Sequence, residues 1–172
     1  MKKLIVICAF MIAVMNLDAM DTSCASLISK IVETTGEQLF FKCKVDNLLI
    51  FPDITLYQFC LSANQTDLLM TDEAILGTAL VIYKKNTASY ELEDFKINKN
   101  VRSKGYGSLF LKEIGTYLRS IGAQEISGWA VPLEDISIKT KERLYAFYQR
   151  NGATEVATKN GRFIMNLKDN NI

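Results

Sequence analysis

The most informative part of this chain is Ile97-Asn98-Lys99-Asn100-Val101-Arg102-Ser103-Lys104-Gly105-Tyr106-Gly107-Ser108, where a strand, a polar turn and a helix start follow one another. Gly105 and Gly107 let the backbone approach a ligand closely and take conformations that other residues avoid. The first turn of a helix carries N–H groups without partners, and the helix dipole favours negative charge there. With Arg102 and Lys104 beside it, this turn is suited to bind an anion such as a pyrophosphate. The spacing is neither a Walker motif nor G-x-G-x-x-G, and the alternative is a helix start whose glycines only permit close packing.

Hydrophobic spacing predicts the elements on both sides of this turn. Strands are expected over Leu39–Val45, Leu68–Met70, Ala74–Tyr83, Ser89–Ile97, Glu125–Val131, Ala153–Thr158 and Arg162–Leu167. Helices are expected over Ser23–Thr35, Gly105–Ile121 and Lys139–Arg150, with short pieces and a loop over 46–66. Asn160-Gly161 is a hairpin signal between the last two strands. This order predicts an α+β (mixed α/β) domain, with a central mixed sheet of about six to seven strands flanked by helices.

Composition excludes several classes of function. The 172 residues suit one domain, and a formal net charge of +1 gives no support for nucleic-acid binding. The chain has no histidine, which removes the commonest general base, the Ser-His and Cys-His pairs and most zinc sites. The four cysteines, at positions 8, 24, 43 and 60, form no C-x-x-C pair. We therefore expect no metal site.

The N-terminal segment differs from the rest of the chain. Lys2 and Lys3 precede an unbroken apolar stretch over 4–15, and the small residue Ala19 follows, which is the three-part layout of a secretory signal. Twelve apolar residues are too few to cross a hydrocarbon core of about 30 Å as a helix. We expect residues 1–20 to be a signal-like or membrane-anchor segment and 21–172 a single domain, exported or tethered through residues 4–15. The alternative is a first helix or strand of a cytoplasmic domain.

Arg102-x-x-Gly105-x-Gly107, after a strand and before a helix, resembles the acetyl-CoA signature of the GNAT superfamily of N-acetyltransferases. Glu91–Ile97 is similar to the family's fourth strand, and Phe147–Ala153 resembles its Phe-Tyr-x-x-x-Gly-Phe motif. The resemblance covers about 68–167, while residues 21–66 fit only loosely as the family's variable first strand and helices. Lys99 replaces a usual proline, Val101 a usual aromatic residue and Ala153 the last aromatic residue of the second motif.

The resemblance implies a GNAT-like fold with acetyl-CoA as acyl donor. It implies that the pantetheine arm lies along Phe95, Lys96 and Ile97, beside Trp129 on the next strand. It also implies that the pyrophosphate lies on backbone N–H groups of the turn, from Arg102, Ser103, Lys104, Gly105, Tyr106 and Gly107, with Ser108 nearby.

The implied reaction is direct attack of a primary amine, of a small molecule or a peptide, on the thioester. The family's proton donor corresponds to Tyr148, although a phenol there could also serve only to pack the helix on the sheet. Glu91 and Glu93, two residues apart on one strand, are candidate bases, and solvated strand carboxylates are the alternative. The second hypothesis is a catalytically silent acyl-CoA-binding or interaction module, which could be exported, and the oligomeric state stays open.

Overall fold

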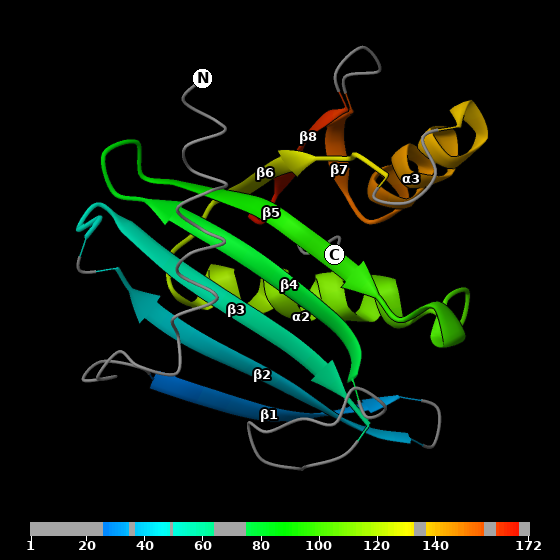
Figure 1. Ribbon diagram of the computed structural model, residues 1–172, viewed down its shortest axis with the longest axis horizontal. Coiled ribbons are helices and arrows are strands. Elements are labelled where there is room, and N and C mark those ends of the chain that lie inside the picture. The colour runs from blue at the N-terminus through cyan, green and yellow to red at the C-terminus, as the bar shows by residue number, and fades with distance from the viewer. Residues whose placement is uncertain are drawn as a thin grey trace.

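Eight strands form one mixed sheet in this computed structural model, which describes residues 26–34, 37–48, 50–63, 75–132, 137–156 and 161–168 (Figure 1). The strands are β1 (Ser26–Thr34), β2 (Glu37–Asn47), β3 (Ile54–Ser62), β4 (Ile75–Lys84), β5 (Ser89–Ile97), β6 (Glu125–Trp129), β7 (Ala153–Val156) and β8 (Arg162–Asn166). Their order in the sheet is β1-β2-β3-β4-β5-β6-β8-β7. A short 3-10 helix, η2 (Lys99–Val101), follows β5, and the helices are α2 (Tyr106–Ser120) and α3 (Ile138–Arg150).

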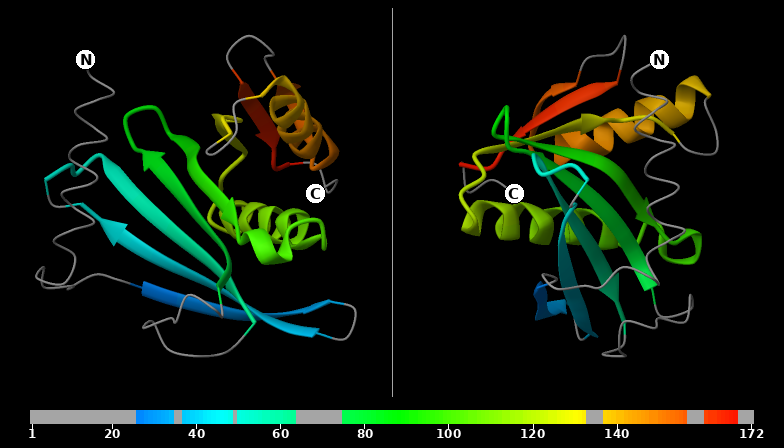
Figure 2. Two further views of the ribbon diagram at one scale, coloured as in Figure 1. Left: turned by 45° about the vertical axis from the view of Figure 1, so that its right-hand side comes forward. Right: turned by 60° about the vertical axis from the view of Figure 1, so that its left-hand side comes forward.

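Strands β1 to β5 form an antiparallel meander, and β5 then pairs in parallel with β6. A parallel neighbour needs a crossover, and α2 supplies it. Phe110 of α2 packs against Phe41 and Phe95, and Tyr148 of α3 stacks on Phe163. Since the register puts these strand residues on one face, both helices cover the same face of the sheet (Figure 2). The predicted order of meander, helix, strand, helix and hairpin is confirmed from β4 onward.

The helix predicted over 23–35 is wrong in its described part, because Ser26–Thr34 is strand β1. Leu27, Ile28, Ile31 and Val32 have helical spacing, yet three of the four are β-branched and suit a strand. The backbone pairs with β2 over nine residue pairs, from Ser26↔Val45 to Thr34↔Glu37. Pairing with β2 therefore determines that residues 26–34 form a strand, because tertiary contacts commonly override a weak local preference for helix.

The loop predicted over 46–66 is also wrong in part, because Ile54–Ser62 forms β3. β3 lies between β2 and β4, where six of its nine side chains are buried and the other three are half-buried. A strand buried on both sides shows no alternation of apolar and polar residues, so the pattern search found no signal. With β1 and β3 included, the sheet has eight strands where about six to seven were expected. Strands occupy 26–34, 37–47 and 54–62 within the segment 21–66, which fitted only loosely as the family's variable first strand and helices.

Some predictions fall outside the described residues. They are the segment 1–20, the strand at 68–70 and most of the hairpin turn at 159–161. Export or tethering through residues 4–15 therefore stays a prediction. No helix in the described ranges is long and apolar enough to span a membrane.

Cys43 and Cys60 lie on neighbouring strands and are both free thiols. Cys43 pairs with Phe59 and Cys60 pairs with Lys42, so the two side chains point to opposite faces of the sheet. Burial raises the pKa of the Cys43 thiol to about 11, and a hydrogen bond with Tyr117 lowers it by less. Both thiols are thus held in their protonated, weakly nucleophilic form at neutral pH.

This burial predicts a loss of stability at alkaline pH. The Cys43 thiol has an ordinary pKa near 9 but titrates near 11 in the folded chain, so its stabilisation is complete below pH 9 and declines as the pH rises toward 11. Between pH 9 and 11, the Cys43 thiol is expected to lower the free energy of unfolding by about 1.4 kcal/mol per pH unit. Urea unfolding of the wild type and of Cys43→Val between pH 7 and 11 measures it. Equal slopes in the two proteins would contradict the assignment.

Candidate functional site

The parallel strands β5 and β6 separate soon after they meet. In the described structure their pairing is limited to Glu91↔Ser127 and Leu92↔Gly128. Residues 93–97 continue β5 beyond this point, whereas β6 ends at Trp129, so no described strand pairs with this edge of β5 (Figure 1). We call this unpaired edge of β5, together with the facing end of β6, the notch. Free backbone N–H and C=O groups at a strand edge can pair with an extended, amide-containing ligand in the manner of an added strand.

Two local features of the sequence produce the notch. A Cβ atom at Gly128 would lie 2.7 Å from Cζ of Phe163 and 2.8 Å from the carbonyl oxygen of Leu92, so only glycine allows these groups to approach. On β5, the pairing with β4 passes from Val81↔Leu92 to Leu80↔Asp94 and leaves Glu93 as the extra residue of a bulge. A bulge bends its strand and increases its twist, which moves the end of β5 away from β6.

The turn after β5 is fixed to the sheet by Asn98. Its backbone N–H donates to the carbonyl oxygen of Leu76 on β4 at 2.9 Å, and its side-chain oxygen accepts from the N–H of Asn100 at 3.1 Å. Ser103 and Gly105 then take left-handed backbone conformations, with φ of 66° and 88°. These conformations reverse the chain direction within a few residues, so α2 begins directly beside the end of β5.

The start of α2 is arranged to accept negative charge. Gly105 caps the helix without a side-chain hydrogen bond, and the first turn contains no acidic residue. The backbone N–H groups of Tyr106, Gly107 and Ser108 therefore rely on a partner from outside the helix. Arg102 and Lys104 are exposed in the same turn. Nε of Arg102 donates to the carbonyl oxygen of Ile97 at 3.1 Å, which holds the guanidinium at the mouth of the notch.

The predicted cofactor-binding residues lie together from the end of β5, through the turn, to the start of α2. Phe95 is half-buried between Phe110 and Phe147, with ring centroids 5.6 Å and 5.9 Å away, and Lys96 is exposed. Ile97 lies beneath Gly107, where a Cβ would be 3.5 Å from Cγ1 of Ile97. The residues of the turn and first helical turn that are exposed are Arg102, Ser103, Lys104, Gly105 and Ser108.

The side chain of Tyr106 leaves the turn. Its hydroxyl donates to Oε2 of Glu37 at the start of β2, at 2.5 Å. This hydrogen bond to a carboxylate raises the pKa of Tyr106 above its ordinary value. The backbone N–H of Tyr106 therefore belongs to the first turn of α2, while its phenol ties α2 to β2.

Tyr148 lies on α3 below the notch and is 4% exposed. Its ring stacks on Phe163 with centroids 4.0 Å apart, and Phe147 meets it edge-on at 5.2 Å. Burial raises the pKa of Tyr148 well above its ordinary value of about 10, and the Asp94 carboxylate raises it further. The phenol thus keeps its proton at any physiological pH and can donate it in a hydrogen bond.

The two predicted bases differ in their surroundings. Glu91 is half-buried, forms an ion pair with Lys84 and accepts a hydrogen bond from Nε1 of Trp129 at 3.2 Å. Glu93 is exposed at the bulge. Sequence reasoning missed Asp94, which is exposed and is the carboxylate whose charge acts on Tyr148. Three acids within 91–94 break the alternation of a regular strand, which was an available signal for the bulge.

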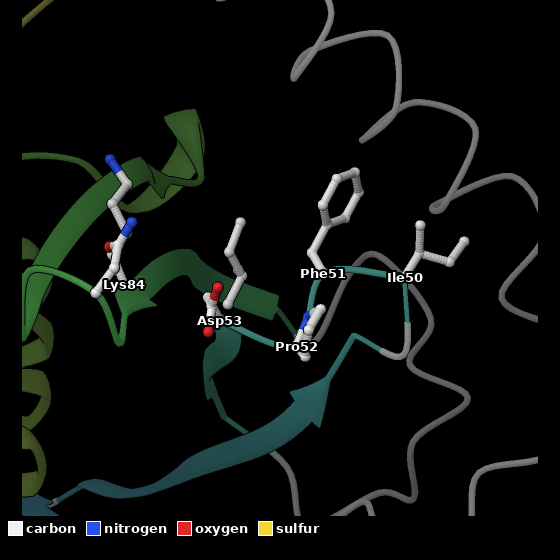
Figure 3. Close-up of a pocket in the computed structure, with 7 residues that line it drawn as sticks. Ile50, Phe51, Pro52, Asp53 and Lys84 are labelled. Carbon is white, nitrogen blue, oxygen red and sulfur yellow. The ribbon is translucent and has the colours of Figure 1, made fainter.

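A separate pocket lies at the other end of the sheet. It has a volume of about 300 Å³ and is lined by Ile50, Phe51, Pro52, Asp53, Ile54, Lys84 and Asn86 (Figure 3). Lys84 pairs with Ser89, at the start of β5, whereas the notch borders residues 93–97 at its end. The described residues include no group of three or more His, Cys, Asp or Glu that could hold a metal ion.

Comparison with protein families and curated proteins finds no match for this chain. Comparison with solved structures finds acetyltransferases. One is an acetyltransferase of the GNAT family from Staphylococcus aureus Mu50, with a TM-score of 0.49 and 18% identity over 66% of this chain and 68% of the other. Nourseothricin acetyltransferase has a TM-score of 0.47 and 16% identity over 90% and 93%. The PaiA N-acetyltransferase from Thermoplasma acidophilum, in complex with coenzyme A, has a TM-score of 0.42 and 16% identity over 66% and 61%.

These identities and TM-scores are low, so inference about function depends on the motif and the geometry of the site. The Arg102–Gly107 turn follows a strand and opens a helix, as the sequence predicted. The strand before it separates from its parallel neighbour after Leu92, and its last five residues lead from that point to the turn. In its α+β architecture and in the place of its motif, the chain resembles the GNAT superfamily of acetyltransferases.

Proposed function

We propose that this protein is an acyl-CoA-dependent N-acyltransferase, which transfers an acetyl group from acetyl-CoA to a primary amine by direct attack. One observation carries the proposal: an uncapped, basic helix start lies directly at the end of a strand whose edge is open. A ligand that combines a pyrophosphate with an extended amide-containing arm matches both halves of this surface. Coenzyme A has that combination, and as acyl donor it supplies an activated thioester.

The residues of the chain have separate tasks in binding. The N–H groups of Tyr106, Gly107 and Ser108 bind the pyrophosphate, with Arg102 and Lys104 adding positive charge. Each charge-assisted hydrogen bond of this kind contributes roughly 1.5–3 kcal/mol. The backbone of residues 95–97 pairs with the amides of the pantetheine arm and directs its reactive end toward Tyr148.

In the transfer step the amine nitrogen forms a bond to the acyl carbon while the carbon–sulfur bond breaks, and the extra proton on the nitrogen then passes to the released thiolate, directly or through water. A carboxylate beside the notch, Glu93 or Asp94, takes the proton of the ammonium directly or through water. Tyr148 donates a hydrogen bond to the sulfur as negative charge develops there. Donors aimed at developing charge are a large source of rate enhancement in water-excluded sites.

The alternative is a catalytically silent acyl-CoA-binding module. The engagement of Glu91 by Lys84 and Trp129 favours it, since the first of the two predicted bases is already held by two partners. Acetyl-CoA binding without turnover on any primary amine would select this alternative.

Calorimetric titration of acetyl-CoA into the full chain tests the proposed site. We expect micromolar affinity for the wild type and no measurable binding for the Arg102→Glu, Gly105→Asp double variant, because it places two negative charges in the anion site. Lys112→Glu, at an exposed position further along α2, is the control for reversed charge and should bind like the wild type. Equal affinity of the double variant and the wild type would place the cofactor elsewhere.

A further inference from the structure

The sheet face opposite α2 and α3 carries an aromatic ring and a carboxylate on the two sides of the notch. Asp94 pairs with Leu80 on β4, next to Ala79, which faces α2, so Asp94 lies on the opposite face. Trp129 follows Gly128, whose missing Cβ faces Phe163, and therefore also points to the opposite face. Trp129 is 37% exposed and Asp94 is exposed, so a ligand that approaches from this side meets both.

The Trp129 ring is held in one orientation. Its Nε1–H donates to Oε1 of Glu91 at 3.2 Å, and Oε2 of the same carboxylate pairs with Lys84. An indole fixed along its edge presents its ring face as a rigid apolar platform. Such a face attracts alkyl or aromatic groups and also cations.

Tyr148 approaches the same notch from the helical side. It is 4% exposed, and within the described residues its hydroxyl has no hydrogen-bond partner. Asp94 is near enough for its charge to act on this phenol. The hydroxyl is not among the enclosed polar atoms that lack a partner, so it stays accessible to a ligand atom at the notch.

The exposed carboxylate of Asp94 borders the notch on this face. Of the nearby cations, Lys84 forms an ion pair with Glu91, Lys96 lies two residues beyond Asp94 toward the glycine-rich turn, and Arg162 is the neighbour of Trp129 on β8. A cation placed there would meet complementary charge.

We propose that this face binds the acceptor, and that the acceptor is a protonated primary amine joined to an aromatic or aliphatic group. The apolar group lies on the Trp129 ring, and the ammonium lies against Asp94, within reach of the thioester. This inference rests on the proposed function, because it names the acceptor class for the same reaction. Trp129 is a specificity-determining residue in this arrangement, and Glu91 is a positioning residue that acts through the ring.

The chain contains one tryptophan, so its fluorescence reports on this site alone. Titration of phenethylammonium into the full chain without acetyl-CoA should give a saturable change in emission. Asp94→Asn should weaken this binding about tenfold or more, since it removes a charge-assisted hydrogen bond. Asp53→Asn, an exposed position at the far end of the sheet, should leave it unchanged. Phenylethanol, which has the same ring and no charge, should bind at least about tenfold more weakly than phenethylammonium.

Acetylation assays separate this inference from the proposed function. With phenethylamine as acceptor, we expect Trp129→Phe to raise KM for the amine about tenfold with kcat changed less than about threefold, because the ring binds the apolar group and does not touch the reacting atoms. The enzyme could acetylate purely polar amines, such as amino sugars, and neither bind nor acetylate phenethylamine. That result would contradict the proposed acceptor class but not the proposed acyltransferase activity. Binding of phenethylammonium by a chain that does not bind acetyl-CoA would support the amine site and refute the enzyme.

Discussion

Tyr148→Phe is expected to lower kcat for amine acetylation about a hundredfold, while the affinity for acetyl-CoA changes less than about threefold. The phenyl ring keeps the stacking on Phe163, at 4.0 Å, and the edge contact with Phe147, so the variant should fold like the wild type. Only the hydroxyl is lost, and with it the hydrogen bond to the departing sulfur. Steady-state kinetics with acetyl-CoA and calorimetric binding measure the two quantities.

The raised pKa of Tyr148 decides what the phenol contributes. A thiol has an ordinary pKa of about 8.5, and the phenol lies above 10, so complete transfer of its proton to the thiolate would be unfavourable by about 2 kcal/mol or more. A hydrogen bond that strengthens as the sulfur gains charge has no such penalty. We therefore expect no loss of kcat from ionisation of this phenol below pH 10, because the proton is still held there.

Tyr90→Phe is the matched control. It removes a hydroxyl from a partly buried tyrosine that stacks with Tyr83 at 4.6 Å near the start of β5, before the strand reaches the notch. Its kcat should equal that of the wild type. If kcat of Tyr148→Phe stayed within about twofold of the wild type, Tyr148 would be a packing residue, as the simpler interpretation of the sequence allowed.

The sequence predicted the parts of the site that depend on local signals. The end of β5, the glycine-rich turn and the start of α2 follow from spacing and turn chemistry within about twenty residues, and the structure places them as expected. The notch could not be predicted in the same way from the residues alone. It depends on a bulge at Glu93 and on the ring of Phe163 filling the space above Gly128, and both are contacts between distant segments.

The different surroundings of the carboxylates of Glu91, Glu93 and Asp94 could not be predicted from the sequence for the same reason. Glu91 and Glu93 are equivalent in a strand pattern, and Asp94 was assigned no role. Only the pairing of β4 with β5 shows that Glu91 lies within reach of Lys84, and only the fold places Asp94 beside Tyr148. The local sequence determines whether a segment forms a helix or a strand, whereas tertiary contacts determine which groups each side chain meets.

Gly128→Ala is expected to destabilise the fold by about 3 kcal/mol, which is at the upper end of the usual cost of overpacking a core. The added methyl group would lie 2.7 Å from Cζ and 2.9 Å from Cε1 of Phe163, and 2.8 Å from the carbonyl oxygen of Leu92. The ring is fully buried and stacked on Tyr148, and the carbonyl belongs to the backbone of β5, so neither can move without disturbing its neighbours. Urea unfolding followed by circular dichroism measures the loss.

Gly107→Ala is the comparison for the same chemical change. Its Cβ would lie 3.3 Å from Cε2 of Phe147, which is the end of a side chain, and alanine is favoured over glycine in a helix by about 1 kcal/mol. Its free energy of unfolding should therefore stay within about 1 kcal/mol of the wild type. A Gly128→Ala protein as stable as Gly107→Ala would show that β5 and β6 can separate further at no cost.

Gly128→Ala should also lower activity, because Gly128 lies beside the proposed site. Leu92↔Gly128 is the last pair before the strands part, and Phe163, above that pair, is the surface on which Tyr148 stacks. A methyl group there would push the ring of Phe163, and with it the phenol, relative to the edge of β5. Acetyl-CoA affinity should fall less than kcat in Gly128→Ala, because the proposed anion site at Gly105 is held to β4 by Asn98 and to β2 by Tyr106, and neither contact involves Gly128.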